Sequence, residues 1–192
     1  MNKGRLEAFS DGVMAIIITI MVLELRPPEE SGLAALLPTL PKFLSYILSF
    51  VFVGIYWNNH HHLWQVVEKV SGRVLWANLH LLFWLSLIPF ATGWMGESGF
   101  AVIPVALYGA ILWMCGLAYY IMVRALRATH PNDSLLVSAI SNDSKERWSL
   151  FLYTASVPLA FVNPSISMII YMIVAVMWLI PDPRIEARVA RK

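Results

Sequence analysis

Charged residues are scarce in this chain. Of its 192 residues, 14% are charged and 58% are apolar, whereas an ordinary soluble domain has about 25% charged and about 45–50% apolar residues. The mean hydropathy is +0.65. These values exclude a soluble globule, because so much apolar surface has to face lipid rather than water. The composition therefore predicts an integral membrane protein.

Cysteine and clustered basic charge are lacking as well. The one cysteine, Cys115, lies inside an apolar run, which excludes a disulfide within the chain and a cysteine-based metal site. The net charge is only +2, and the basic residues are scattered instead of forming a patch for phosphates, so we expect no nucleic-acid partner. We also find no Ser-His-Asp arrangement and no glycine-rich phosphate loop, so an enzyme is not expected.

The sequence is rich in long apolar segments. Six can be distinguished, each bounded by charge, proline or glycine, at about 6–25, 41–66, 74–95, 100–123, 147–163 and 165–181. A ~30 Å hydrocarbon layer needs roughly 20 helical residues, so the last two segments are short. No internal repeat is apparent. The sequence therefore predicts an all-α protein in which residues 1–192 form a single domain of six transmembrane helices.

The basic residues predict the orientation in the membrane, because Lys and Arg in short loops are retained on the cytoplasmic side. Only Arg26 and Lys42 would lie on the outer side. The others would share the cytoplasmic side: Lys3, Arg5, Lys69, Arg73, Arg124, Arg127, Lys145, Arg147, Arg184, Arg188, Arg191 and Lys192. We therefore expect a multi-pass protein of the cell membrane with both termini in the cytoplasm, which agrees with an even number of helices.

The first apolar segment has the most informative pattern. Small side chains recur at helical spacing at Ala8, Gly12, Ala15 and Thr19, which permits close helix contact in lipid. Beside them run the branched residues Ile16, Ile20 and Leu23. If several copies of this helix surrounded an axis, these residues would form apolar rings that could gate ions by dewetting. On spacing alone, ordinary helix packing is the favoured interpretation of such a stripe.

The residues that precede the stripe change this interpretation. The run Arg5-Leu6-Glu7-Ala8-Phe9-Ser10-Asp11-Gly12 resembles the signature of the endosomal and lysosomal potassium channels of the transmembrane protein 175 family. Further resemblance lies in the run from Trp57 to Trp64 and in the third segment, from Asn78 through Leu87-Ile88-Pro89-Phe90 to Gly96-Glu97. The match covers the first three segments, and beyond Phe100 only the segment count resembles the family.

The resemblance implies a homotetramer whose first helices line a central path for potassium. Ile16 would form the hydrophobic bottleneck, with Thr19 beside it and Ile20 and Leu23 as further rings. The Thr-Val-Gly-Tyr-Gly filter of other potassium channels is lacking, so we expect modest selectivity. Apart from sister subunits and the bilayer we expect no partner, no small-molecule substrate and no cofactor, with potassium as the permeant ion.

The resemblance also implies a polar network at the cytoplasmic end of the first helix. Its members would be Arg5, Ser10, Asp11, His60 and Asn78, with a structural or gating role. The alternative is a proton-coupled secondary transporter in which Asp11 and His60 relay protons. Adjacent helical residues diverge by about 100°, so the three consecutive histidines 60–62 do not predict a metal site. At the outer end, Glu24 is expected to line a vestibule that concentrates cations.

Overall fold

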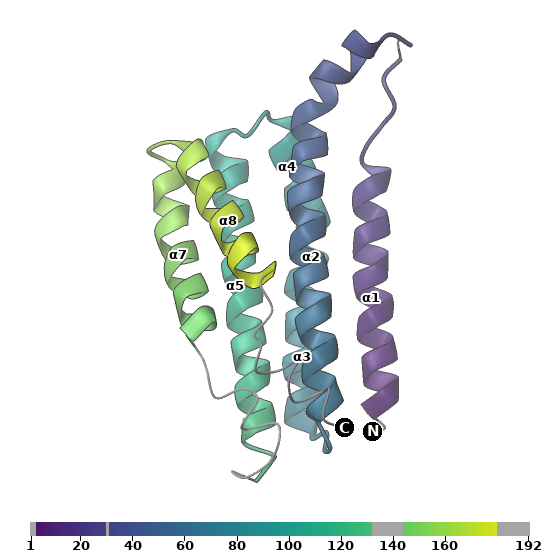
Figure 1. Cartoon of the computed structure of the whole chain (residues 1–192), viewed down its shortest axis with the longest axis vertical. Coiled ribbons are helices and arrows are strands. Elements are labelled where there is room, and N and C mark those ends of the chain that lie inside the picture. Colours follow the sequence, from purple (N-terminus) through teal and green to yellow (C-terminus); the bar gives the residue numbers. More distant parts are fainter. Residues whose placement is uncertain (1–2, 30, 132–143, 180–192) are drawn as a thin grey trace.

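The computed structural model describes residues 3–29, 31–131 and 144–179, and these are helical apart from short connections. The elements in chain order are α1 (Lys3–Leu23), the short 3-10 helix η1 (Leu33–Thr39), α2 (Leu40–Val66), α3 (Gly72–Ser86), α4 (Ile88–Glu97), α5 (Val102–Arg127), α7 (Ser144–Ala160) and α8 (Pro164–Leu179). They form an elongated bundle with α1 at one edge and α7 and α8 at the other (Figure 1). The predicted all-α fold with six helical passes is confirmed, with α3 and α4 together making the third.

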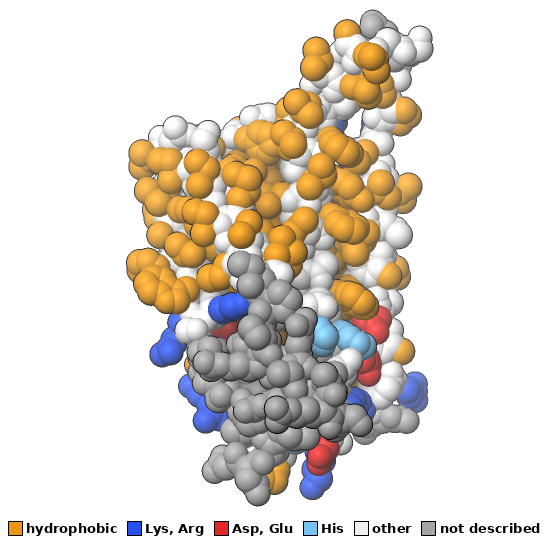
Figure 2. Space-filling model, in the orientation of Figure 1, with side chains coloured by type: hydrophobic (Ala, Val, Ile, Leu, Met, Phe, Trp, Pro, Cys, Tyr) orange, Lys and Arg blue, Asp and Glu red, His pale blue; other side chains and the backbone are white. Residues whose placement is uncertain are grey.

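The surface of the bundle is divided into an apolar part and a charged end. Among the described residues, four spans are long and apolar enough to cross a membrane: α1, η1 with α2, α3 with α4, and α5. The last two helices are shorter, at 17 residues for α7 and 16 for α8, as the sequence predicted. Figure 2 shows apolar side chains over the upper part of one face and charged side chains at the lower end. We call this lower end, where α1 begins, the basic end.

The third predicted segment, expected as one helix over 74–95, is divided at Leu87 into α3 and α4. Pro89 explains the break. A proline inside a helix lacks the N–H donor, and its ring collides with the carbonyl four residues earlier, here that of Leu85. The backbone N–H of Leu87 bonds instead to Trp84 at 3.2 Å. The two helices together still cover a 26-residue apolar span.

The packing centre of the bundle is α5, which contacts α3, α4, α7 and α8. One close approach depends on Gly109, where a Cβ would collide with the buried hydroxyl of Tyr171 on α8. That hydroxyl donates to the Val105 carbonyl at 3.0 Å. Buried hydroxyls also join α2, α4 and α5, because Ser49 lies 2.9 Å from Tyr108 and 2.6 Å from Thr92. Such bonds satisfy polar groups that lipid cannot hydrate.

Candidate functional site

The helix α1 has one covered face and one bare face. Its buried residues recur every three or four positions and pack against α2, α3 and α4; they are Leu6, Ser10, Met14, Ile17 and Met21. On another side of the helix, Ile16 is 58% exposed and Leu23 is 78% exposed. Within the described part of the chain, no element covers this side. An apolar side chain can be this exposed in a membrane protein when it faces lipid or another subunit.

The structure brings the predicted pore-lining residues together on this bare face. Ile16, Thr19, Ile20 and Leu23 are all exposed and lie along one side of α1. The Thr19 hydroxyl donates to the Ile16 carbonyl at 2.9 Å, so it is satisfied within its own helix. The small residues beside the stripe are exposed too, and a Cβ on Gly12 would meet no atom within 4 Å. The close-contact surface of α1 is therefore not used inside the described subunit.

A buried chain of polar side chains fixes the half of α1 that lies nearer the basic end. Asn78 on α3 donates from Nδ2 to the Ser10 hydroxyl at 2.9 Å, and Ser10 donates to the Leu6 carbonyl at 2.9 Å. His60 Nε2 on α2 lies 2.8 Å from Asn78 Oδ1. Trp64, one helical turn further on, donates from its indole nitrogen to the same His60 Nε2 at 2.8 Å. Ser10, His60, Asn78 and Trp64 each have an exposure of 0%.

The hydrogen bonds around His60 cannot all be made at once. An indole N–H only donates and an amide oxygen only accepts, so a single protonation state of Nε2 satisfies either Trp64 or Asn78 in this arrangement. His60 Nδ1 is buried and has no hydrogen-bond partner among the described residues. An exchange of the two ends of the Asn78 amide would let both neighbours donate to Nε2. The cluster thus depends on one amide orientation and one histidine tautomer.

Two of the five predicted network residues lie outside this cluster. Asp11 is half-buried, and its Oδ1 accepts from the Trp57 indole nitrogen at 3.1 Å. The Arg5 side chain is exposed and forms no hydrogen bond or ion pair with another described residue. Beside Asp11, Glu7 Oε1 lies 3.4 Å from His61 Nδ1, and the His61 ring stacks on Trp57. The structure therefore groups Ser10, His60 and Asn78 in one cluster, and Asp11 in a second, more exposed one.

Trp57 and Trp64 were not among the predicted network residues, yet Trp57 binds Asp11 and Trp64 binds His60. A signal was present in their spacing, because Trp64 follows His60 by four residues and His61 follows Trp57 by four. Side chains four apart on a helix are neighbours on its surface. The Trp–His pairs could therefore have been proposed from sequence.

At the opposite end, Glu24 follows α1 and lines a small cavity with Lys42 and Glu97. Lys42 Nζ pairs with Glu97 Oε1 at 3.1 Å. The predicted vestibule acid is exposed and lies beside this ion pair. In the residues that the structure describes, no three His, Cys, Asp or Glu side chains come together as metal ligands would.

Comparison with known proteins shows to which family the chain belongs. Residues 5–89 match the family described as the endosomal/lysosomal potassium channel TMEM175. A potassium channel of Chryseobacterium sp. (strain P1-3) is 57% identical over 186 residues, which cover 97% of each chain. The chain belongs to the TMEM175 family. A potassium channel of Streptomyces collinus is 29% identical over 97% of each chain.

A solved TMEM175 relative has the same fold. The crystal structure of a lysosomal potassium-selective channel TMEM175 homologue from Chamaesiphon minutus superposes with a TM-score of 0.81 at 27% identity, covering 92% of this chain and 96% of that one. The predictions of a membrane ion channel, and of a protein that is not an enzyme, are confirmed by membership of the TMEM175 family.

Proposed function

We propose that the chain is a potassium-permeable cation channel of the cell membrane, in which four copies of α1 surround a central pore. The observation that carries this proposal is the bare face of α1. Ile16, Ile20 and Leu23 are exposed on a helix that is anchored along its other side. In a tetramer about this face, the three residues of each chain would form successive apolar rings. Such rings hold back ions until water fills the passage.

A pore of this kind needs several chains. A single helix face cannot enclose water, and the sequence contains no internal repeat that could supply further lining helices from the same chain. Identical subunits around a closed symmetry axis supply them. The sequence also lacks the Thr-Val-Gly-Tyr-Gly filter, so a cage of backbone carbonyls is not the source of selectivity. The proposal therefore includes modest selectivity for potassium over sodium.

The polar cluster is proposed to set the position of α1 relative to its own subunit. Ser10 is tied through Asn78 to α3 and through His60 to α2. A change in these bonds would tilt α1 and so alter the distance between opposing Ile16 side chains. The cluster is thus a structural or gating element. The outer Glu24 would add negative potential where cations enter, with the basic end in the cytoplasm.

A proton-coupled transporter is the alternative function. It would require Asp11 and His60 to exchange a proton. In the subunit these side chains have different partners, Trp57 for Asp11 and Asn78 with Trp64 for His60. This separation favours the channel. Relatives from several vertebrates, including a human one 35% identical over 54% of this chain, are named endosomal/lysosomal proton channels, so permeation by protons belongs in the same test.

The test is ion flux from proteoliposomes loaded with potassium, with either potassium or sodium outside. Ile16→Asn places a polar side chain in the proposed narrowest ring. We expect potassium flux to rise about tenfold and the preference for potassium over sodium to fall. The asparagine amide would hold water in the constriction, so the barrier that a dry apolar ring presents to ions would be lost. The matched control is Ile173→Asn on α8, where the isoleucine is 52% exposed on the opposite edge of the bundle. This control should conduct as the unchanged protein does.

Two results would overturn the proposal. Ile16→Asn could leave flux unchanged, or it could act no differently from Ile173→Asn. A transporter would instead be slowed or uncoupled by Ile16→Asn, so a lower flux with a changed dependence on the proton gradient would favour the alternative. A proton-sensitive dye in the same liposomes measures that dependence.

A further inference from the structure

The outer seam between α5 and α7 lies toward the edge of the bundle opposite α1 (Figure 1). The Trp113 indole nitrogen on α5 donates to the Thr154 hydroxyl on α7 at 2.9 Å, which fixes the register of the two helices. They run in opposite directions, so seven residues after Trp113 and seven residues before Thr154 both lead about 10 Å toward the basic end, on the same face of each helix. Tyr120 on α5 and Arg147 on α7 occupy these positions. The register therefore places them at one height along the seam.

Two arginines at this height carry charges that the described residues do not neutralise. The guanidinium carbon of Arg124 lies 5.2 Å from the centre of the Tyr120 ring, which is one turn earlier on α5. Arg124 and Arg147 are both exposed, and neither forms a hydrogen bond or an ion pair with another described residue. A guanidinium group has five N–H donors in a planar fork and no acceptor. The seam thus presents two donor forks on either side of a tyrosine ring.

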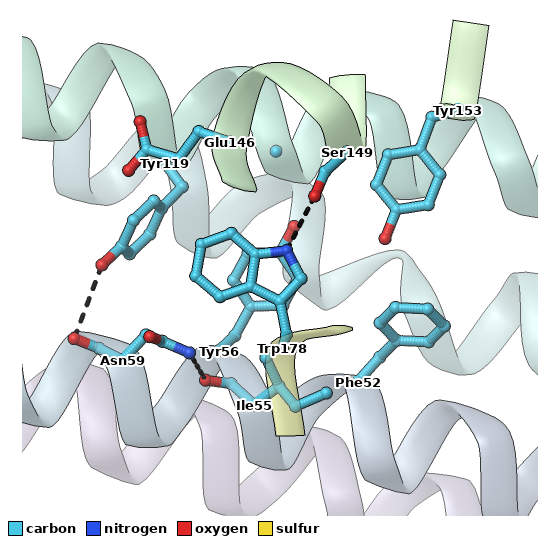
Figure 3. Close-up of a pocket in the computed structure, with 10 residues that line it drawn as sticks. Phe52, Ile55, Tyr56, Asn59, Tyr119, Glu146, Ser149, Tyr153 and Trp178 are labelled. Carbon is cyan, nitrogen blue, oxygen red and sulfur yellow. Dashed lines mark hydrogen bonds between the residues drawn. The ribbon is translucent and has the colours of Figure 1, made fainter. Parts of the chain in front are cut away.

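The acidic residue next to this pair faces a different space. Glu146 precedes Arg147 on α7, and it lines a cavity of about 30 Å³ between α2, α5, α7 and α8 (Figure 3). The walls of this cavity are largely aromatic and include Tyr119 and Trp178. Consecutive helical residues diverge by about 100°, so Arg147 points away from the aromatic cavity, toward the exposed seam. The two guanidinium groups are therefore open to a ligand that approaches from outside the bundle.

Exposed aromatic side chains follow the arginine directly along α7. Trp148 is 60% exposed and Phe151 is 62% exposed, and their rings meet edge to face at 5.8 Å. Both lie farther from the basic end than Arg147 does. Tryptophan and tyrosine are enriched where hydrocarbon meets lipid headgroups, and arginine extends its charge toward the headgroups. The order of arginine, indole and phenyl ring along α7 therefore places Arg147, and Arg124 beside it, at the height of the lipid phosphates.

We infer that Arg124 and Arg147 bind the phosphate group of an anionic phospholipid at the seam between α5 and α7. Arginine forks match phosphate oxygens in geometry and charge, and the Tyr120 ring holds one fork in place. A zwitterionic lipid brings its own cation, which the two arginines repel. Free phosphate has the same oxygens but no acyl chain to cover Trp148 and Phe151, so the lipid is the favoured source. This site lies apart from the bare face of α1 and does not depend on the pore proposal.

The first experiment counts retained lipid by native mass spectrometry. The full-length protein is purified in mixed micelles with equal amounts of phosphatidylglycerol and phosphatidylcholine of the same acyl chains. We expect phosphatidylglycerol to be retained preferentially, and Arg124→Gln and Arg147→Gln each to weaken its binding by about tenfold, the usual loss for a hydrogen bond to a charged group. Tyr120→Leu should weaken it by about threefold, because the ring no longer orients Arg124. The matched control is Arg73→Gln, an exposed arginine at the basic end on α3, which should leave the preference unchanged.

The second experiment distinguishes the lipid from free phosphate. The unfolding temperature is measured in detergent with phosphatidylglycerol added, and separately with sodium phosphate against sodium chloride at equal ionic strength. Phosphatidylglycerol should raise this temperature in the unchanged protein and in Arg73→Gln, but not in Arg147→Gln, whereas sodium phosphate should have no effect. Equal unfolding temperatures of all variants without lipid would show that each is folded. The inference is overturned if both lipids are retained equally, if Arg73→Gln loses as much lipid as Arg147→Gln, or if sodium phosphate stabilises the protein as the lipid does.

Discussion

Two helices of similar hydropathy, α1 and α5, have opposite surroundings. Over an 18-residue stretch of each helix the mean hydropathy is 2.0 in α1 and 1.8 in α5, yet 28% of the stretch in α1 and 56% of the stretch in α5 is buried. Neighbouring helices surround α5, whereas α1 lies at the edge of the bundle (Figure 1). The stripe of branched residues on α1 is exposed. Apolar composition places both helices in lipid, but it does not show which face meets a protein partner. We interpret α5 as scaffold and the bare face of α1 as the functional surface.

The comparison is tested most strongly on α1 itself, by truncating one residue on each face. Met14 is 1% exposed and packs against the bundle, so Met14→Ala should lower the free energy of unfolding by about 3 kcal/mol through the cavity that it leaves. Ile16→Ala should lower it by less than about 1 kcal/mol, because Ile16 has no covering neighbour within the described subunit. Unfolding in detergent micelles measures both values, at a detergent concentration that dissociates oligomers. Equal losses would refute the two-faced interpretation of α1.

The attachment of α1 can be loosened without touching α5. Asn78→Leu removes the amide that joins Ser10 to His60, and the loss of its buried hydrogen bonds should cost about 2 kcal/mol, although Ser10 keeps its bond to Leu6 and His60 its bond from Trp64. Hydrogen exchange should then increase in the first half of α1 and remain unchanged in α5. The control is Asn58→Leu, where the asparagine is exposed on α2. Uniform exchange over both helices would show that the cluster stabilises the whole bundle.

Much of the fold could be predicted because hydropathy reports directly which segments lie in lipid. The expected segments 6–25 and 41–66 differ from α1 and α2 by at most three residues at either end. Packing is a different matter. The Ser10–Asn78 bond joins residues 68 positions apart. Both residues were expected to belong to one polar network, but the bond between them was not predicted. Local spacing carries no information about such a contact.

The break between α3 and α4 and the aromatic cavity show two other limits. Pro89 was visible in the sequence, but a proline can kink a membrane helix without ending its apolar run, so hydropathy favoured one segment. The cavity requires side chains from α2, α5, α7 and α8 to converge. The same aromatic residues are common in the interior and at the ends of membrane helices, so their sequence positions alone do not suggest a site.

The scaffold side of the comparison is tested at Gly109. A Cβ at this position collides with the Tyr171 hydroxyl, so Gly109→Ala should destabilise the protein by about 1–2 kcal/mol, despite the higher helix propensity of alanine. Adding Tyr171→Phe removes the nearest atom and should recover part of the loss. Alanine at Gly12, where no atom lies within 4 Å, should not destabilise the isolated subunit. A loss at Gly12 that matches the loss at Gly109 would contradict the difference between the helices.

The smallest effect is expected at the ion pair between Lys42 and Glu97, which joins α2 to α4 at the end opposite the basic end. The two side chains are 33% and 61% exposed, so water screens their attraction and the pair should contribute less than about 1 kcal/mol. A double-mutant cycle with Lys42→Met and Glu97→Gln measures this coupling through the free energy of unfolding. Cation flux measured at low and at high salt tests separately how the charges at this end of the protein affect permeation. Because Glu24 lies beside the pair, removing Lys42 should raise cation flux at low salt even though stability hardly changes. A coupling free energy well above about 1 kcal/mol would instead show that the Lys42–Glu97 pair stabilises the fold as the packing around α5 does.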